Sequence, residues 1–289
     1  MIDGAESLGP DDELSADICI VGAGPAGIAI ALQFLDAGAR VVMLESGGRR
    51  PDRASQELCR GEVVNEHLHP PADTYRRRGL GGSTSVWGGR CAPFDPQDFE
   101  PRPWLAAPSG WPIEYSALVP YWRRAHAVCE LGTYDYAAGS AITGGMRPMF
   151  PGFVDGAVST ACIERFSRPT DFARTYGPAL ARSRCVRVLL GALCVNIILH
   201  PDLRTVRHLE AAGCGGGKFR VRARTFVLAA GGLEVPRLLQ APYIDIGTSA
   251  ARPWHRQRDC AAAPSKAERC RPQDGGAVGG PLGPADTAL

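Results

Sequence analysis

Short apolar runs and glycine turns alternate along the first fifty residues of the chain. Residues 18–21 form an apolar run that is typical of a short buried strand. A glycine-rich turn follows, and the nearly all-apolar segment 25–36 predicts a helix packed against a sheet. Gly38 ends this helix, and a second apolar run, 41–44, ends at Glu45. This order predicts a β-α-β unit at the start of an α/β fold.

Two later stretches predict the rest of the same sheet. Residues 186–200 are β-rich, and residues 218–240 indicate strand, turn, strand, glycine turn and helix in that order. The apolar run 226–228 ends in small residues, which let a ligand approach the end of a strand. A sheet that begins near residue 17 and is completed near residue 230 must accommodate a long insertion. We therefore predict an α/β fold with a Rossmann-like, mainly parallel sheet.

The pattern is weaker between these parts and stops after residue 240. Residues 121–131 predict an amphipathic helix, residues 132–156 are rich in loop formers, and residues 163–183 predict a strand and then a helix. Ala, Arg, Pro and Gly dominate residues 241–289, which we expect to be a disordered tail. The abrupt change in composition suggests a frameshift or a truncation of the natural sequence.

Composition and charge narrow the function only slightly. The formal charge of +2 argues against nucleic acid and against an acidic membrane surface as the main partner. No run is long and apolar enough to span a bilayer, and the acidic N-terminus lacks the pattern of a signal peptide, so we expect a cytoplasmic protein. The ten cysteines contain no CxxC pair, so we expect reduced, mostly buried thiols and no metal site.

The first glycine turn matches the GxGxxG pattern of dinucleotide-binding proteins. Gly22 permits a tight turn, Gly24 lets the backbone approach a pyrophosphate, and Gly27 lets the helix lie close to the strand. The start of the helix offers N–H groups to phosphates. Glu45 can accept both ribose hydroxyls, and its charge disfavours NADP. The candidate nucleotide-binding residues here are Gly22, Gly24, Pro25, Ala26, Gly27 and Glu45. The motif alone leaves FAD and NAD open.

A second glycine-rich stretch, RGLGGSTSVWGGR at 78–90, has two interpretations. It is either a flexible linker or a place where the backbone approaches a ligand closely. Gly/Ser linkers do not normally contain a tryptophan, and Trp87 therefore favours the second interpretation.

Together these motifs resemble the N-terminal, FAD-binding part of the glucose–methanol–choline (GMC) oxidoreductases. The likeness is to the bacterial branch near pyranose oxidases and sugar dehydrogenases. The matching pieces are VGAGPAGIAIA from residue 21, the stretch 78–90, SGWPIEYSALVPYWRRA at 109–125 and VLAAGGLEVPRLL at 227–239. They occur in the order of the family and cover most of residues 16–240.

The resemblance implies that the stretch 78–90 lies along FAD, near the pyrophosphate and the flavin ring. Backbone N–H groups and hydroxyls would bond the cofactor, and Trp87 would pack beside the ring. Val86 stands where pyranose oxidases carry a histidine that tethers FAD, so the resemblance implies non-covalent FAD. Cys194 falls where the main chain of the family contacts adenine. The further candidate cofactor-binding residues are Gly81, Gly82, Ser83, Thr84, Ser85, Trp87, Gly88, Gly89, Cys194, Ala230 and Gly231.

The family oxidises CH–OH groups of alcohols, sugars or polyols by hydride transfer to flavin N5, while a base takes the hydroxyl proton. That base is a histidine, paired with a second histidine or an asparagine, from a segment that follows the FAD-binding half. Residues 241–289 do not resemble this segment. No histidine matches the base, and the catalytic residue stays unknown; the histidines are His67, His69, His126, His200, His208 and His255. We therefore expect this chain itself to be inactive or poorly active.

The resemblance also implies a division of the chain into parts. These are a flexible N-terminus (1–15), a first part of the FAD-binding domain (16–130), a partial substrate-facing region (131–182), a second part of the FAD-binding domain (183–240) and the tail (241–289).

Three functions remain open from the sequence. The preferred one is an FAD-dependent oxidoreductase with a small-molecule alcohol or sugar as substrate, an unknown electron acceptor, and no nucleic-acid or membrane partner. The alternative is a non-catalytic FAD- or nucleotide-binding remnant, or a subunit of a larger complex. An NAD-dependent dehydrogenase would leave residues 81–89 and 227–232 without a role.

Overall fold

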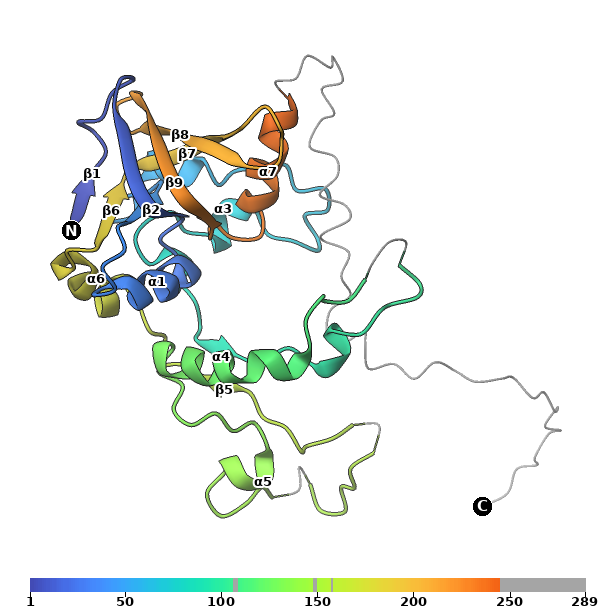
Figure 1. Ribbon diagram of the computed structural model, residues 1–289. Helices are drawn as coiled ribbons and strands as arrows, with labels where there is room; N and C mark the ends of the chain where they lie inside the picture. The colour runs from blue at the N-terminus through green and yellow to red at the C-terminus, as the bar shows by residue number, and fades with distance from the viewer. Residues whose placement is uncertain (106–108, 148–149, 157, 245–289) are drawn as a thin grey trace, which may run out of the picture. The chain divides into compact units, whose positions relative to one another are not determined.

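A seven-stranded sheet is the main element of the larger of two units (Figure 1). The computed structural model of the protein describes residues 1–105, 109–147, 150–156 and 158–244. The first unit contains the described residues up to Tyr136 and from Glu164 onward, and the second contains those between Ala137 and Ile163. The second unit carries the short helix α5 (Ala138–Ala141) and an antiparallel bridge between Ala137 and Cys162.

The strands of the sheet follow the order β1-β6-β3-β2-β9-β8-β7. The pairs β1-β6, β6-β3, β3-β2 and β2-β9 are parallel, whereas β9-β8 and β8-β7 are antiparallel. The mainly parallel sheet predicted from the sequence is therefore confirmed. The strands are β1 Ile2–Gly4, β2 Glu13–Val21, β3 Val41–Glu45, β6 Val186–Leu190, β7 Ala192–Leu199, β8 Val206–Gly213 and β9 Lys218–Leu228.

The register of the parallel strands brings three carboxyl ends to one edge. Val21, the last residue of β2, pairs with Leu44 of β3 on one side and with Leu228 of β9 on the other. The turns that follow these strands therefore begin side by side, although β3 and β9 are far apart in the sequence. In open α/β sheets, ligands bind at this edge.

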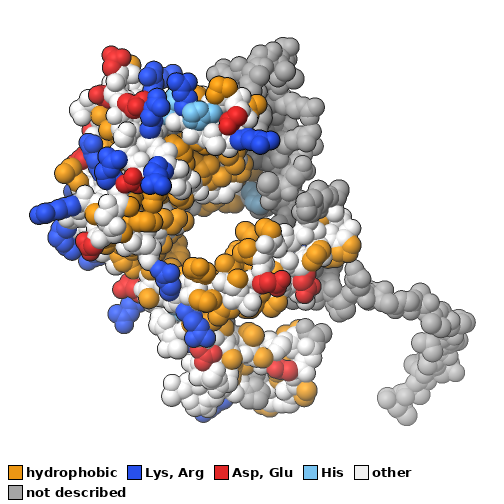
Figure 2. Space-filling view, in the orientation of Figure 1, with side chains coloured by type: hydrophobic (Ala, Val, Ile, Leu, Met, Phe, Trp, Pro, Cys, Tyr) orange, Lys and Arg blue, Asp and Glu red, His pale blue; other side chains and the backbone are white. Residues whose placement is uncertain are grey.

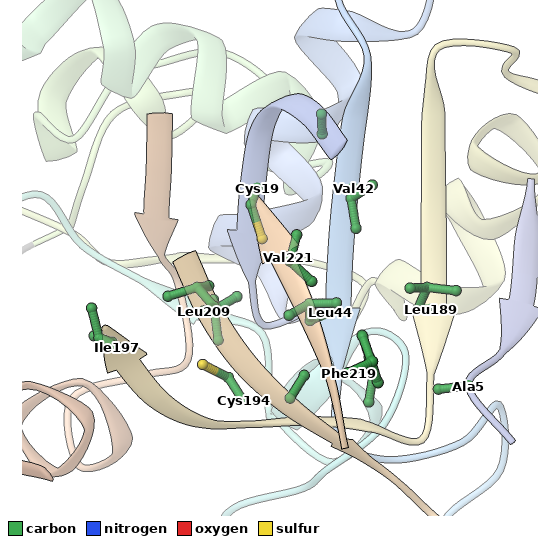
Figure 3. Packing of buried hydrophobic residues seen from close by; sticks show 14 of the residues in the cluster. Ala5, Cys19, Val42, Leu44, Leu189, Cys194, Ile197, Leu209, Phe219 and Val221 are labelled. Atoms are coloured by element: carbon green, nitrogen blue, oxygen red, sulfur yellow. The ribbon is translucent and has the colours of Figure 1, made fainter. Parts of the chain in front are cut away.

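Two hydrophobic clusters cover the faces of the sheet, because successive strand residues point to opposite sides. Ile20 and its neighbours pack in one cluster with helices α1 and α6, including Ile28. Cys19 belongs to the other cluster, which Figure 3 shows, together with Leu209 and Phe219. The helices of this unit are α1 Pro25–Ala31, α2 Arg53–Glu57, α3 Ala72–Tyr75, α4 Tyr115–Val128, α6 Phe172–Arg182 and α7 Glu234–Ile244.

Short turns and strands complete the first unit. The 3-10 turns are η1 Leu32–Phe34, η2 Gly82–Ser85 and η3 Pro96–Asp98, and a small antiparallel pair joins β4 Arg90–Cys91 to β5 Arg165–Phe166. The amphipathic helix predicted over 121–131 corresponds to α4, and the strand and helix predicted over 163–183 correspond to β5 and α6.

The N-terminus and the tail boundary differ from the sequence predictions. Residues 1–15 were expected to be flexible, but β1 pairs with β6 and β2 already begins at Glu13. The edge of β6 offers backbone partners to β1, and a three-residue strand is too short to show a hydrophobic period. Helix α7 continues to Ile244, past the predicted boundary at residue 240. The rest of the predicted tail lies outside the described residues.

Strand β9 and helix α6 also correct the sequence predictions. The turn expected within 218–228 is absent from this described segment, because β2 pairs with β9 from Glu13 to Val21 and keeps it extended. Helix α6 was assigned to a substrate-facing region, 131–182. Its Phe172 and Leu180 are instead buried in the cluster that packs on the sheet of the first unit.

Candidate functional site

The turn after β2 lies against the end of β9. Gly22 has a φ of +104°, and a Cβ on it would lie 2.6 Å from the carbonyl oxygen of Ala229. The Gly22 N–H donates to the Leu44 carbonyl (2.7 Å), and the Ala229 N–H donates to the Val21 carbonyl (2.8 Å). A Cβ on Gly27 would lie 2.0 Å from the Gly22 carbonyl oxygen. Side chains at these two glycines would therefore collide with the protein itself.

Gly24 faces different surroundings in the same turn. It precedes α1, and a Cβ on it would have no protein atom within 4 Å. The next two residues, Pro25 and Ala26, are exposed. The start of α1 therefore borders open space, into which N–H groups of a helix start can direct their positive ends.

The second glycine stretch lies directly against this turn. The Gly81 N–H donates to the Ala23 carbonyl (2.8 Å), and a Cβ on Gly82 would be 3.0 Å from the Cα of Gly24. Both Gly81 and Gly82 have positive φ, so ordinary side chains would strain the backbone there. The structure thus brings together two motifs that lie nearly sixty residues apart in the sequence. A flexible linker would need no such contact, so this packing favours the interpretation that the backbone approaches a ligand here.

Glu45 joins the turns at the end of β3. Its carboxylate accepts N–H groups from Ala23, Gly47 and Gly79, each at 2.9 Å. The side chain is buried, and burial raises the pKa of Glu45, although the three N–H donors act in the opposite direction. A carboxylate has about four acceptor positions. Most of these are occupied by the protein here, and ribose binding by Glu45 stays a prediction.

The hydroxyl residues of the stretch have partners within the protein. Thr84 is buried; its Oγ1 donates to the Gly81 carbonyl (2.6 Å) and accepts the Phe172 N–H (3.2 Å). Ser83 Oγ accepts the Arg77 N–H (3.1 Å), which leaves its own proton to donate. Ser85 is exposed, and its Oγ donates to the Gly82 carbonyl (3.0 Å). Thr84 therefore stabilises the turn, whereas Ser83 and Ser85 can still reach a ligand.

The end of the stretch is anchored on the segment before α6. Trp87 Nε1 donates to the Thr170 carbonyl (3.1 Å), so its indole has a fixed orientation. A Cβ on Gly89 would lie 2.6 Å from the carbonyl oxygen of Ser167, whereas one on Gly88 would have no protein atom within 4 Å. Val86 is half exposed. Gly89 is thus required by protein packing, and Gly88 borders open space.

The glycine turn after β9 completes this edge. The Cα of Ala230 would be 2.9 Å from a Cβ on Gly22. Gly231 has a φ of +89°, and its carbonyl accepts the N–H of Val235 at the start of α7. The structure therefore places Ala230 beside the first glycine turn.

Cys194 lies in β7 within the core, and Figure 3 shows its thiol there. Burial raises the pKa of Cys194 to about 12. The side chain is therefore a packed neutral thiol, and the predicted adenine contact of its main chain stays a prediction.

The described histidines do not reveal a catalytic base. His126 is buried in α4, and its Nε2 lies 2.9 Å from the Tyr136 hydroxyl. Burial lowers the pKa of His126 and of His208. His67 and His69 are exposed in a loop, and His255 lies outside the described residues.

Sequence reasoning missed a charged cluster beside the glycine turns. Arg76 and Arg78, from the run before Gly79, contact the carboxylate of Glu234 in α7. The signals that could have revealed it are three successive arginines before one glycine turn and an acidic residue after the other.

Two further classes of site find no support in the described ranges. Within them, no group of three or more His, Cys, Asp or Glu side chains could hold a metal ion. No helix among them is both long and apolar enough to cross a bilayer. Basic and acidic side chains are interspersed on the part of the first unit that carries β1 and β2 (Figure 2), in agreement with the nearly balanced charge of the sequence.

Comparisons with known proteins identify the fold. No protein-family model matches the chain. A curated protein, 6-methylpretetramide 4-monooxygenase of Streptomyces rimosus, is 46% identical over 55 residues, which is 19% of this chain and 12% of that protein. The solved structure of pyridoxine 4-oxidase from Mesorbium loti matches 78% of this chain and 51% of its own, with a TM-score of 0.50 and 22% identity. A formate oxidase structure matches 79% and 48%, with a TM-score of 0.44 and 17% identity.

The chain spans about half the length of the solved structures that it matches. Pyridoxine 4-oxidase is a GMC oxidoreductase. The pyridoxine 4-oxidase match covers most of this chain. The described residues therefore have the FAD-binding fold of the GMC oxidoreductases.

Proposed function

We propose that the chain binds FAD non-covalently and forms the FAD-binding part of a GMC-type oxidoreductase that acts on a CH–OH group of an alcohol, sugar or polyol. One observation carries this proposal: the turns after β2, β3 and β9 and the stretch 79–82 meet around the open space beside Gly24. Dinucleotides bind at this kind of edge, with the pyrophosphate at the start of the helix.

The packing of the second glycine stretch favours FAD over NAD. Gly81 and Gly82 are held against Ala23 and Gly24. A dinucleotide that lies along the first turn would therefore also meet this stretch. An NAD-dependent dehydrogenase gives the stretch no role, whereas an extended FAD uses it.

The protein contributes binding and orientation. When bound, FAD supplies the acceptor for a hydride, and the protein chiefly positions the reactants. Backbone N–H groups near Gly24 would hold phosphates, Ser83 and Ser85 would add hydroxyl contacts, and Trp87 would help to exclude water. Val86 offers no nucleophile for a covalent bond to the cofactor.

A non-catalytic FAD-binding protein is the second candidate. The observation that favours it is the position of His126, whose ring is bonded to Tyr136 and close to the Gly132 carbonyl. Among the described residues, no histidine is placed as a base at the glycine turns. FAD binding is common to both candidates, and substrate oxidation separates them.

The absorption spectrum of the purified chain tests the proposal. We expect a flavin band that is lost from the protein fraction after acid precipitation, because Val86 forms no covalent bond. A separate portion of the purified chain, not treated with acid, is titrated with NAD. A chain that takes up NAD and no flavin contradicts the proposal, and flavin that stays with the precipitate contradicts its non-covalent part.

A further inference from the structure

A partly buried charge cluster connects the two segments on either side of the proposed flavin site. Oε1 of Glu234 lies 3.2 Å from Nη1 of Arg76 and 3.0 Å from Nη2 of Arg78. Its Oε2 lies 2.7 Å from Nε of Arg237, one turn further along α7. The side chains of Glu234 and Arg78 are only 14% and 10% exposed, so these pairs are shielded from water and salt far better than a surface pair.

The cluster acts on the residues that build the site. Arg78 directly precedes Gly79, whose N–H donates a hydrogen bond to Glu45. Nη1 of Arg78 also donates to Ser46 Oγ (2.9 Å). Glu234 follows the glycine turn of β9 and begins α7. The ion pair of Arg78 and Glu234 therefore joins the residue before the stretch 79–82 to the start of the helix that follows β9.

We infer that Glu234 is a positioning residue of the proposed flavin site, which holds the stretch 79–82 against the turn at Gly22–Gly24 through Arg76 and Arg78. This inference rests on the proposed function. Glu234 touches neither glycine turn through its carboxylate in the contacts described above, and it acts through the arginines.

The charges explain why the carboxylate matters. Burial acts to raise the pKa of Glu234, but the hydrogen bond from Arg237 and the positive charges of Arg78 and Arg76 outweigh it and lower that pKa. Without the carboxylate, three guanidinium groups would face one another in a partly buried place. Removing one partner of such a pair leaves a costly uncompensated charge. Arg78 already has a buried Nε without a partner in the described structure.

Binding and loop order are then linked. If Glu234 keeps the stretch 79–82 in place, a variant without the charge spends a smaller fraction of time in the binding-competent form. The apparent Kd rises in proportion to the inverse of that fraction. By the same linkage, bound FAD restores order to the stretch.

The test compares Glu234→Gln with Glu13→Gln as a matched control. Glu13 also pairs with an arginine far away in the sequence, Arg222, but at the opposite end of β2 from Gly22. We measure the FAD Kd by quenching of flavin fluorescence and the rate of trypsin cleavage at Arg76–Arg78. We expect Glu234→Gln to raise the Kd at least tenfold and to accelerate this cleavage, and we expect saturating FAD to slow it again. Glu13→Gln should stay within threefold of the wild-type Kd.

The outcomes separate the inference from the proposed function. If the wild-type chain binds no FAD, both are overturned. If the wild type binds FAD and Glu234→Gln stays within threefold of Glu13→Gln, only the inference is overturned. If Glu234→Gln does not fold, Arg76→Met decides, because it removes one contact between the segments and leaves Arg78 and Arg237 on the carboxylate. A threefold or larger rise of its Kd supports the inference, and a smaller one overturns it.

Discussion

Gly24 and Gly27 lie three positions apart in one turn, yet side chains at these positions meet opposite surroundings. A Cβ on Gly27 would collide with the Gly22 carbonyl, whereas one on Gly24 would enter open space. The fold can therefore accept a side chain at position 24 but not at position 27. This contrast separates the requirements of packing from those of a ligand at the scale of single residues.

Gly24→Val should therefore leave the fold intact and abolish flavin retention. The valine would fill the space that a pyrophosphate needs, and we expect the FAD Kd to rise roughly a hundredfold or more, or about 2.7 kcal/mol. The flavin-to-protein absorbance ratio and the thermal unfolding midpoint are the measurements. The control is Gly61→Val, an exposed position with no protein atom within 4 Å of its Cβ. Normal flavin occupancy in the Gly24 variant would contradict the site.

Glu45 should give the stability of the protein a defined pH dependence. Its folded-state pKa is raised above the ordinary value of about 4.3. Its contribution to stability is therefore fully present below the unfolded pKa and is lost as the pH rises through the folded pKa. Glu234 acts in the opposite sense and in a lower window, because its pKa is lowered.

Urea unfolding of the wild type and Glu45→Gln at several pH values between 4 and 8 isolates this contribution. We expect the unfolding free energy of the wild type to fall, relative to that of the variant, as the pH rises from about 4.3. The glutamine has no charge to bury, but it leaves one of the three N–H groups unpaired, at a cost of about 1–3 kcal/mol. A difference that rises with pH would show that the carboxylate is not desolvated.

Strand β9 decides at the scale of elements whether the site can form. Its pairing with β2 over the full length of that strand sets the position of Ala229 against Gly22. Phe219, 1% exposed, anchors β9 in the core, and the next residue, Arg220, is exposed. The strand thus links the packing of the core to the edge of the sheet at which we propose that FAD binds.

Phe219→Ala should lower the free energy of unfolding by about 3–5 kcal/mol. Arg220→Ala, on the same strand, should change it by no more than about 0.5 kcal/mol. Denaturant unfolding measures both variants without FAD. Adding FAD should raise the stability of the Phe219 variant again, because a ligand that binds only the folded state stabilises it. Equal effects of the two substitutions would show that the core does not extend to β9.

The sequence predicted the elements that carry their own local pattern. The run 18–21 and the run 41–44 were recognisable as continuous apolar runs and the turn at Gly22–Gly27 as a glycine motif, and the structure contains all three. β1 was missed because three residues show no period, and the continuous β9 because its extension depends on β2. Local pattern thus predicts elements, while pairing decides their ends.

The candidate site shows the same limit. The two glycine motifs were recognisable alone, but the contact between Gly82 and Gly24 depends on the folded chain. The pair of Arg78 and Glu234 is separated by more than 150 residues and has no spacing that a sequence pattern could reveal. The hydrogen bond from the Phe172 N–H of α6 to Thr84 likewise joins residues far apart in the sequence, so no local pattern could predict it.

At the scale of the whole molecule, the described residues contain the edge at which we propose that FAD binds, and none of them is assigned as a base. A general base contributes about 10²–10⁴-fold to a rate. We therefore expect the 289-residue chain loaded with FAD to bleach slowly with glucose, other sugars, gluconate or simple alcohols in the absence of oxygen. Stopped-flow absorbance is the measurement. Bleaching at roughly 1 s⁻¹ or faster would reveal a base that we have not assigned, and His126→Gln would be the first variant to test.

The order of the strands also has a consequence for synthesis of the protein. β2 leaves the ribosome early, but its partner β9 and the turn at Ala229 follow about two hundred residues later. At about 5–20 residues per second, this delay is on the order of 10–40 seconds. During that interval the nascent chain contains the complete GxGxxG turn, but the residues after β9 that pack against Gly22 have not yet been made. At the site that we propose, FAD binding must therefore be a late event. Until β9 is made, the edge of β2 that pairs with it is open to wrong pairing.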